Sequence, residues 1–251
     1  MPFGLCNAPA TFQRLMERCV GELNHKECLI YLDDIIIYSA DIDSHLERLD
    51  AVFKRLAEFN LTIKPSKCEF FKTETTYLGH VVSSEGIKAD PKKTDAVHSW
   101  PVPKNGKEVR QFLGFAGYYR RFVKDYARLA RPLNDLLVGQ PTKKTTKTKG
   151  KPQKPKKPPP FVWGEDQQKA FEILKSCLTN PPELGYADYT KPFLLHTDAS
   201  LYGLGAVLYQ SQGDVDRVIA YVSRSLRKSK KAYQVHKLEF LALNWSVTEK
   251  V

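Results

Sequence analysis

The sequence lacks the features that would place the chain in a membrane or in an oxidising compartment. It has no run of 18 apolar residues, so we expect no membrane partner. Its first residues, MPFGLCNAPA, lack the basic and sustained apolar regions of a signal peptide. The five cysteines form no C-x-x-C pair, which argues against disulfides or zinc and indicates a reducing environment. We therefore expect an intracellular protein, in the cytoplasm or the nucleus.

Acidic and apolar residues are both missing from one tract, residues 140–160. It reads QPTKKTTKTKGKPQKPKKPPP and holds eight lysines, without which the net charge of the chain would be +3 instead of +11. A tract with nothing apolar to bury cannot form a core, so we predict an extended linker. Non-specific phosphate contact or a nuclear-import signal is the alternative. The chain as a whole, at 42% hydrophobic and 27% charged residues, has the composition of a globular protein.

Glycine is missing where a tight hairpin would favour it. In IYLDDIIIY, residues 30–38, Asp33 and Asp34 stand between two apolar runs that both read as buried strands. Two-residue hairpin turns favour Asn-Gly or Asp-Gly, because the central residues need positive φ. Buried carboxylates, in turn, are usually paired, metal-bound or protonated. From these residues alone, a polar hairpin turn and a metal site both remain open.

The sequence before the linker predicts helices and short strands on either side of Asp33 and Asp34. NAPATFQRLMERCV reads as a helix capped by Asn7, and a capping box of Ser44 and Glu47 predicts a helix from about Ser44 to Phe59. LTIKPSKCEFF and TTYLGHVVSSEGI read as short strands with turns, and Asn105 with Glu108 caps a second helix.

That second helix ends in GYYRRF, where aromatic rings stand beside cations. Such a mixture suits nucleic-acid contact through base stacking and phosphate pairing. The alternative is that the tyrosines belong to the core and the arginines form a solvated rim. The candidate contact residues are Tyr118, Tyr119, Arg120 and Arg121.

The part after the linker predicts a helix, three strands and a closing helix. The strands read KPFLLHTDAS, GLGAVLYQ and RVIAYVSR, and the last helix runs from about Lys231 to Glu249. Glu239 lies roughly 60° around that helix from the apolar residue Ala242, at the edge of its buried face. We expect its carboxylate to meet that of Asp198 at the end of the sheet. Taken singly, each acid is equally a helix cap or a surface charge.

Five motifs in this order resemble the reverse transcriptase and RNase H region of gypsy-like LTR retrotransposon polyproteins. They are MPFGLCNAPATFQ, YLDD, YLGHVVSSEGI, FLGFAGYYRRFV and HTDAS with GLGAVL, and the resemblance covers nearly the whole chain apart from the linker. It implies an α+β chain that is truncated at both ends. The implied parts are a partial reverse-transcriptase palm (1–90), a helical thumb or connection-like region (91–139), the Lys/Pro-rich linker (140–160) and a partial RNase H-like α/β domain (161–251).

The resemblance also implies two sites that use Mg²⁺ or Mn²⁺. In the polymerase, an RNA-directed DNA polymerase, Asp33 and Asp34 would bind the metals of nucleotidyl transfer, because such metals prefer hard oxygen ligands. In the ribonuclease H, a hydrolase acting as an endonuclease, Asp198 and Glu239 would bind the metals that activate water. The nucleotide and template pocket would include Phe3, Gly4 and Gln13, and the primer grip would include Leu78, Gly79 and His80.

The implied partners are an RNA template with a DNA primer, dNTP, an RNA–DNA hybrid and the remaining polyprotein segments. The family's polymerase needs another aspartate upstream of PFGL, and its ribonuclease H needs at least one more metal-binding aspartate after the Glu239 helix. We therefore expect the isolated chain to be inactive. Two alternatives are a catalytically dead nucleic-acid-binding protein, which uses the linker and the Tyr/Arg helix, and an inert, poorly folded product of a decayed element.

Overall fold

The chain divides into two compact units, Met1–Leu78 and Gly79–Val251. A computed structural model describes residues 4–140, 159–213, 215–230 and 232–249. The predicted linker, residues 140–160, lies outside the described residues except at its ends. Along the chain, the first unit ends at Leu78, whereas the predicted palm extends to residue 90. Residues 79–90 of the predicted palm therefore belong to the second unit.

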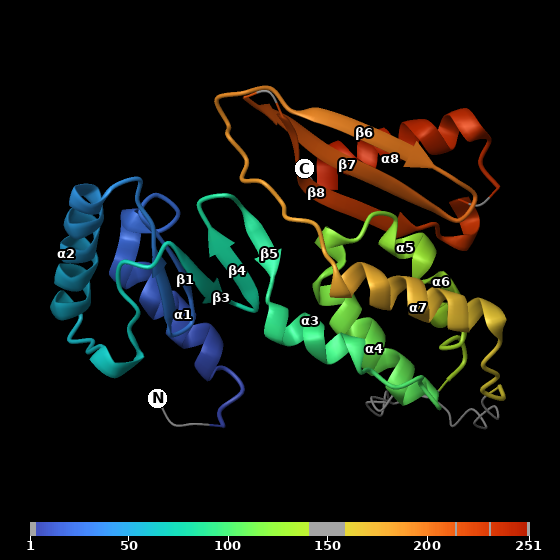
Figure 1. The fold of residues 1–251 in the computed structure, drawn as a ribbon, viewed down its shortest axis with the longest axis horizontal. Helices are drawn as coiled ribbons and strands as arrows, with labels where there is room; N and C mark the ends of the chain where they lie inside the picture. Colours follow the sequence, from blue (N-terminus) through green and yellow to red (C-terminus); the bar gives the residue numbers. More distant parts are fainter. Residues whose placement is uncertain (1–3, 141–158, 214, 231, 250–251) are drawn as a thin grey trace, which may run out of the picture. The chain divides into compact units, whose positions relative to one another are not determined.

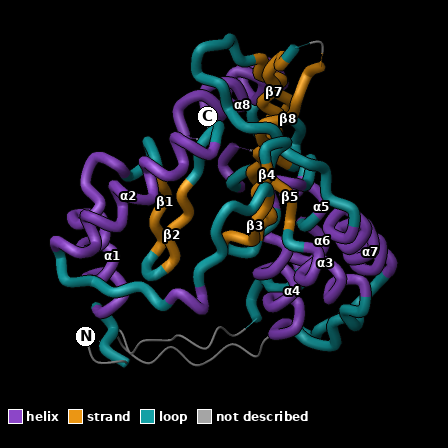
Figure 2. The backbone as a smooth tube through the Cα atoms, turned by 60° about the vertical axis from the view of Figure 1, so that its left-hand side comes forward, coloured by secondary structure: helices purple, strands orange, loops and turns teal. Residues whose placement is uncertain are grey.

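The first unit consists of a β-hairpin covered by two helices (Figure 2). The hairpin buries Cys28 against Met16, Cys19 and Val20 of the first helix and Val52 of the second. The elements are α1 (Ala8–Val20), η1 (Gly21–Leu23), β1 (Cys28–Tyr31), β2 (Asp34–Ile37), α2 (Ile42–Glu58), η2 (Pro65–Lys67) and β3 (Glu74–Tyr77).

The start of α2 differs from the sequence-based prediction. The helix begins at Ile42, and the side chain of Asp41 accepts a hydrogen bond of 2.8 Å from the backbone N–H of Ser44. This bond holds the pKa of the Asp41 carboxyl below its usual value. The predicted cap at Ser44 is therefore wrong, because an acid three residues earlier satisfies the free N–H groups of the first turn. The predicted strand in LTIKPSKCEFF is also wrong, since that segment is irregular apart from η2.

The second unit combines a short hairpin, a group of helices and a three-stranded sheet (Figure 1). The ring centroids of Phe112 and Phe171 lie 4.7 Å apart in the largest core cluster of this unit, which also includes Leu133 and Leu174. The elements are β4 (His80–Ser83), β5 (Ile87–Ala89), α3 (Pro91–His98), α4 (Gly106–Tyr118), η3 (Arg120–Phe122), α5 (Tyr126–Leu129), α6 (Arg131–Asp135), α7 (Glu165–Thr179), β6 (Leu194–Ala199), β7 (Gly203–Gln212), β8 (Val215–Ser225), η4 (Lys228–Lys230) and α8 (Val235–Glu249).

The sheet has the order β6-β7-β8, and both strand pairs are antiparallel. Helix α8 packs on one face, where Leu238, Ala242 and Trp245 contact Leu204. The segments η3 and α5 contact β8 on the other face, where the Ser223 hydroxyl accepts a hydrogen bond from the Ala127 backbone N–H. Helical segments therefore contact both faces of the sheet, with η3 and α5 contacting the second face at β8 and α5 also at β7.

The predicted elements of this unit are largely confirmed. Helix α4 begins after Asn105, whose side chain accepts hydrogen bonds from the N–H groups of Lys107 and Glu108. The three predicted strands correspond to β6, β7 and β8, while the closing helix begins at Val235, later than predicted. Within the described part of the chain, no helix combines the length and apolar character needed to cross a membrane.

Candidate functional site

The two central acids lie at the tip of the β1–β2 hairpin. Tyr31 pairs with Asp34, so Leu32 and Asp33 form the turn and Asp34 is the first residue of β2. Leu32 has φ +55°, in the left-handed region that side-chain-bearing residues rarely adopt. This conformation costs a leucine about 1–2 kcal/mol. The turn is therefore a strained one that the surrounding structure has to stabilise.

The side chain of Gln13, on α1, supplies part of that stabilisation. Its Oε1 accepts a hydrogen bond of 2.7 Å from the backbone N–H of Leu32. Its Nε2 donates to the carbonyl of Ile30 at 3.4 Å and to the Glu17 carboxylate at 2.9 Å. Gln13 was predicted to line the nucleotide and template pocket, and in the structure it binds the backbone of the turn that carries the acids.

Asp33 and Asp34 are exposed, and neither carboxylate has a hydrogen-bond or ion-pair partner among the described residues. Burial raises the pKa of the Tyr77 hydroxyl, and the negative charge of Asp34 raises it further. Carboxylate oxygens that face solvent without partners fit the ligand chemistry of Mg²⁺ or Mn²⁺. The described residues hold no group of three or more His, Cys, Asp or Glu side chains, however, so this hairpin alone is an incomplete metal site.

The remaining pocket residues precede α1. Phe3 lies outside the described residues. Gly4 is exposed, has φ +92°, and has no atom within 4 Å of the position that a Cβ would take. The positive φ therefore explains why a glycine stands at this position, and the close approach of its backbone to a base stays a prediction.

The primer-grip-like segment forms a tight turn between β3 and β4. Leu78 and Gly79 both have positive φ, of 49° and 73°. The carbonyl of Gly79 accepts hydrogen bonds from the Tyr119 hydroxyl at 2.9 Å and from the Asp90 N–H at 3.1 Å. A Cβ on Gly79 would lie 3.1 Å from the Tyr119 oxygen. The end of α4 therefore fixes this turn through its backbone.

His80 packs into an aromatic group at the same place. Its ring is stacked on Tyr118, with centroids 5.4 Å apart and an interplanar angle of 13°, and meets Tyr119 edge-on. Its Nδ1 is buried and has no hydrogen-bond partner among the described residues. Burial lowers the pKa of the imidazole, and the nearby Arg121 lowers it further. The neutral ring is the form that this environment favours.

The predicted nucleic-acid residues divide into two kinds. Tyr119 is only 2% exposed, and its burial raises the pKa of its hydroxyl to about 12. Arg120 donates to the Ser223 carbonyl and lies over the Tyr126 ring at 5.2 Å. Contacts within the chain thus account for Tyr119 and Arg120. Tyr118 and Arg121 have exposed side chains, and their contact with nucleic acid stays a prediction.

Asp198 and Glu239 are the two acids of the candidate hydrolytic site, and both are exposed. Asp198 pairs with Gly205 across the sheet, whereas its neighbour Ala199 faces α8. Because successive residues of a strand face opposite sides, Asp198 lies on the face away from α8. Neither carboxylate has a hydrogen bond or ion pair in the described chain, and the predicted meeting of the two stays a prediction.

The end of the sheet that carries Asp198 is also the end from which the chain leads into α8, the helix of Glu239. Asp198 is the last residue but one of β6, beside the start of β7. Strand β8 ends at the same edge, because Gly203 pairs with Ser225, and the chain leads from there into α8. A metal shared by the two side chains would lie beyond this edge. The topology is compatible with such a site without completing it.

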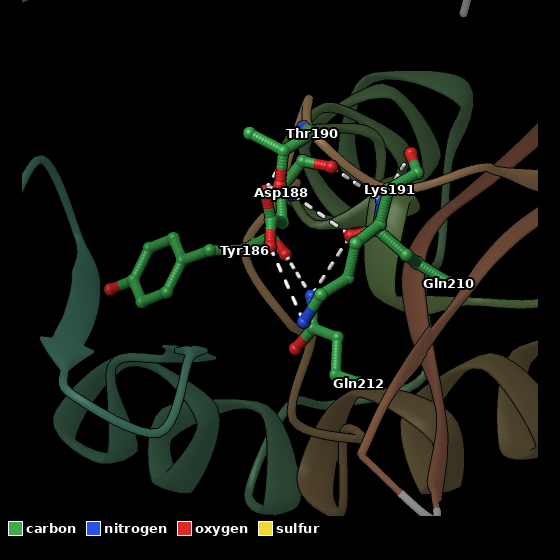
Figure 3. Close-up of polar contacts among 6 residues, drawn as sticks. All are labelled: Tyr186, Asp188, Thr190, Lys191, Gln210 and Gln212. Carbon is green, nitrogen blue, oxygen red and sulfur yellow. Dashed lines mark hydrogen bonds and ion pairs between the residues drawn. The ribbon is translucent and has the colours of Figure 1, made fainter.

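The sequence reasoning missed a buried polar network around Gln210 (Figure 3). The Gln210 side chain is fully buried and binds the backbone of Asp188 and Lys191. A signal was present in the sequence, since Leu204, Ala206 and Leu208 on the same alternating face of β7 are apolar. A glutamine in phase with such a set is expected to be buried and hydrogen-bonded.

Two families match this chain. The family described as reverse transcriptase (RNA-dependent DNA polymerase) matches residues 1–82, and the family described as an RNase H-like domain found in reverse transcriptase matches residues 163–250. Similar proteins include the retrovirus-related Pol polyproteins of the Drosophila melanogaster transposons opus (41% identical over 98% of this chain) and 297 (42% over 98%). The chain covers 24% and 21% of those two relatives, about a quarter of their length or less.

Solved structures share the fold. One is a foamy viral protease-reverse transcriptase dRH in complex with ds DNA, with a TM-score of 0.80 and 21% sequence identity. The match covers 98% of this chain and 40% of the foamy viral chain. A foamy viral protease-reverse transcriptase in complex with RNA/DNA hybrid matches with a TM-score of 0.78, over 31% of its own chain. Both structures therefore share the fold of this chain. The chain belongs to the reverse transcriptase and RNase H-like region of retrotransposon Pol polyproteins.

Proposed function

We propose that this chain supplies part of an RNA-directed DNA polymerase and of an attached ribonuclease H. The observation that carries the proposal is the strained Leu32–Asp33 turn, which Gln13 binds and which leaves Asp33 and Asp34 facing solvent without partners. Backbone strain of this kind persists only where surrounding contacts determine the conformation, and such strained residues cluster at functional sites. The substrates would be a dNTP and an RNA template with a DNA primer.

The residues would act in defined roles. Asp33 and Asp34 would hold divalent cations, which when bound stabilise charge on the attacking 3′-oxygen and on the leaving pyrophosphate. Gln13 would keep the turn in place, and the Gly79–His80 backbone would contact the primer end. Asp198 would hold the cations of the hydrolytic site together with Glu239, with an RNA–DNA hybrid as substrate.

We further propose that the isolated chain is inactive. Each candidate site offers two carboxylates, and no described cluster reaches three metal-binding side chains. A two-metal site needs its full set of ligands, so other segments of the polyprotein would have to supply the rest. The proposed place of action is inside the cell, in the cytoplasm or the nucleus.

The test is a pair of substitutions in the longer reverse transcriptase–RNase H part of a polyprotein that contains this sequence. Asp33→Asn is expected to lower Mg²⁺-dependent primer extension by about 10²-fold or more while leaving hybrid cleavage intact, and Asp198→Asn is expected to do the opposite. Asp95→Asn, an exposed aspartate on α3, is the matched control and should leave both activities unchanged. Full primer extension by Asp33→Asn would overturn the assignment of the polymerase site.

The second candidate is a nucleic-acid-binding protein without catalysis. It is favoured by the exposed ring of Tyr118, which is 54% accessible and stacked on His80, next to the exposed Arg121. Exposed rings beside cations provide a stacking surface for bases. This reading predicts an affinity of the 251-residue chain for RNA or DNA that falls steeply with salt and is unchanged by Asp33→Asn. Failure to bind at low salt would exclude it.

A further inference from the structure

The connection between α7 and β6 (residues 180–193), which we call the α7–β6 connection, contacts the β4–β5 hairpin. Ile87 and Leu184 form an isolated antiparallel bridge, with N···O distances of 2.8 Å and 3.0 Å. Leu184 is fully buried, and Lys88 forms an ion pair of 3.1 Å with Glu183. The connection thus adds a short strand-like contact to the edge of β5.

Tyr186 adds a second contact at the tip of the same hairpin. Its hydroxyl lies 2.9 Å from the carbonyl oxygen of Ser83 and 3.2 Å from that of Gly86, and it donates to both. In Figure 3 its side chain points away from the glutamine network. The environment of this hydroxyl is partly buried, and burial raises its pKa. The tyrosine therefore closes the turn that joins β4 to β5.

The same connection is anchored to the sheet at its other side (Figure 3). The Gln210 amide accepts from the Asp188 N–H at 2.8 Å and donates to the Asp188 and Lys191 carbonyls at 2.7 Å and 3.2 Å. Gln212 donates to the Tyr186 carbonyl at 2.6 Å, and the Gly185 N–H donates to β8. A buried amide whose groups are all bonded fixes its partners in one arrangement, because any other leaves it unsatisfied.

We propose that Tyr186 is a positioning residue, which fixes the β4–β5 hairpin relative to the RNase H-like sheet through the α7–β6 connection. The inference rests on the proposed function, because the hairpin begins at His80, directly after Gly79 of the primer-grip-like segment. Its consequence is specific to an enzyme with two activities. The connection sets the spacing along the nucleic acid between the primer end and the site where the RNA strand is cut.

The structural half of the proposal is tested in the 251-residue chain by hydrogen exchange. Tyr186→Phe removes the hydroxyl alone and is expected to speed exchange of the Ile87 amide by about 5- to 30-fold, as the loss of one or two hydrogen bonds implies. Tyr189→Phe is the matched control on the same connection, since Tyr189 is 89% exposed and its hydroxyl has no partner in the described chain. Equal exchange in both variants would overturn the proposal.

The functional half is tested in the longer reverse transcriptase–RNase H part of the polyprotein. In Tyr186→Phe, the RNA cuts are expected to spread over a wider range of distances from the primer 3′ end, with total hydrolysis unchanged. A purely structural role would lower both activities together and leave the cutting distance unchanged, which would overturn the inference. If the parent protein neither extends primers nor cuts hybrids, the proposed function fails, whereas the exchange experiment still decides whether Tyr186 fixes the hairpin.

Discussion

Replacing Gln13 with methionine would separate the strained turn from the helix that stabilises it. Methionine fills a similar volume but offers only a weakly accepting sulfur in place of Oε1 of Gln13, which accepts from the Leu32 N–H at 2.7 Å. The weaker bond to the Ile30 carbonyl, at 3.4 Å, is lost as well. The change therefore removes polar contacts at the turn with little change in packing.

The magnitude follows from the kind of bond that is lost. A neutral hydrogen bond contributes about 0.5–1.5 kcal/mol, and a partly buried N–H left without a partner costs somewhat more. Leu32 is already in an unfavourable conformation, so the loss adds to the strain of the turn. We expect the turn to open more easily by about 1–2 kcal/mol, which corresponds to roughly 5- to 30-fold faster exchange of the Leu32 amide.

The assay is amide hydrogen exchange on the 251-residue chain, read residue by residue across the β1–β2 hairpin. Gln111→Met is the matched control, because Gln111 is an exposed glutamine on α4 without a partner among the described residues. Gln13→Glu keeps an acceptor oxygen and is expected to retain most of the protection. Equal exchange of the Leu32 amide in Gln13→Met and Gln111→Met would refute the reasoning. Faster exchange throughout the unit would show general destabilisation instead of a local contact.

Two further predictions concern the β4–β5 hairpin. Gly86→Ala is expected to lower the free energy of unfolding by about 1–3 kcal/mol in thermal unfolding, because its Cβ would lie 2.3 Å from the Leu184 carbonyl oxygen. Gly114→Ala, on α4, is the control and should not lower the free energy of unfolding, because its Cβ would have no atom within 4 Å. Because the folded-state pKa of His80 lies below its ordinary 6.5, its contribution to stability is present above that pH and is lost as the pH falls through the folded-state value. The melting temperature of the chain should fall less on acidification in His80→Phe than in the parent, and an equal fall would contradict this.

The secondary structure was predictable where short-range signals determine it. Asn105 caps α4 as expected, and the strand predicted in KPFLLHTDAS corresponds to β6. The cap of α2 was misplaced because Ser44 and Asp41 are both good capping residues, and only the backbone geometry decides between them. Such choices between neighbouring candidates depend on where the preceding chain enters the helix.

The contacts that hold the candidate sites were not predictable from local patterns. Gln13 lies on a helix and bonds to a turn far along the sequence, and no periodicity links the two. A turn centred on Asp33 and Asp34 was one of two alternatives that the residues left open, and the central residues of the turn are Leu32 and Asp33. Leucine rarely adopts a positive φ, so no local pattern indicated that Leu32 would occupy the turn. Tyr186 is similar, since its partners are backbone carbonyls of a distant hairpin.

The α7–β6 connection also affects how sequences of this kind can recombine. A crossover inside residues 141–158 would join a β4–β5 hairpin from one parent to a connection from another. The Ile87–Leu184 bridge would survive, because it uses backbone atoms that every parent supplies. Lys88 with Glu183, and the tyrosine at position 186, would have to be inherited together to keep their contacts. Chimeras joined near Leu78 and Gly79 would keep all these partners in one parent's sequence, and should be the more readily tolerated hybrids.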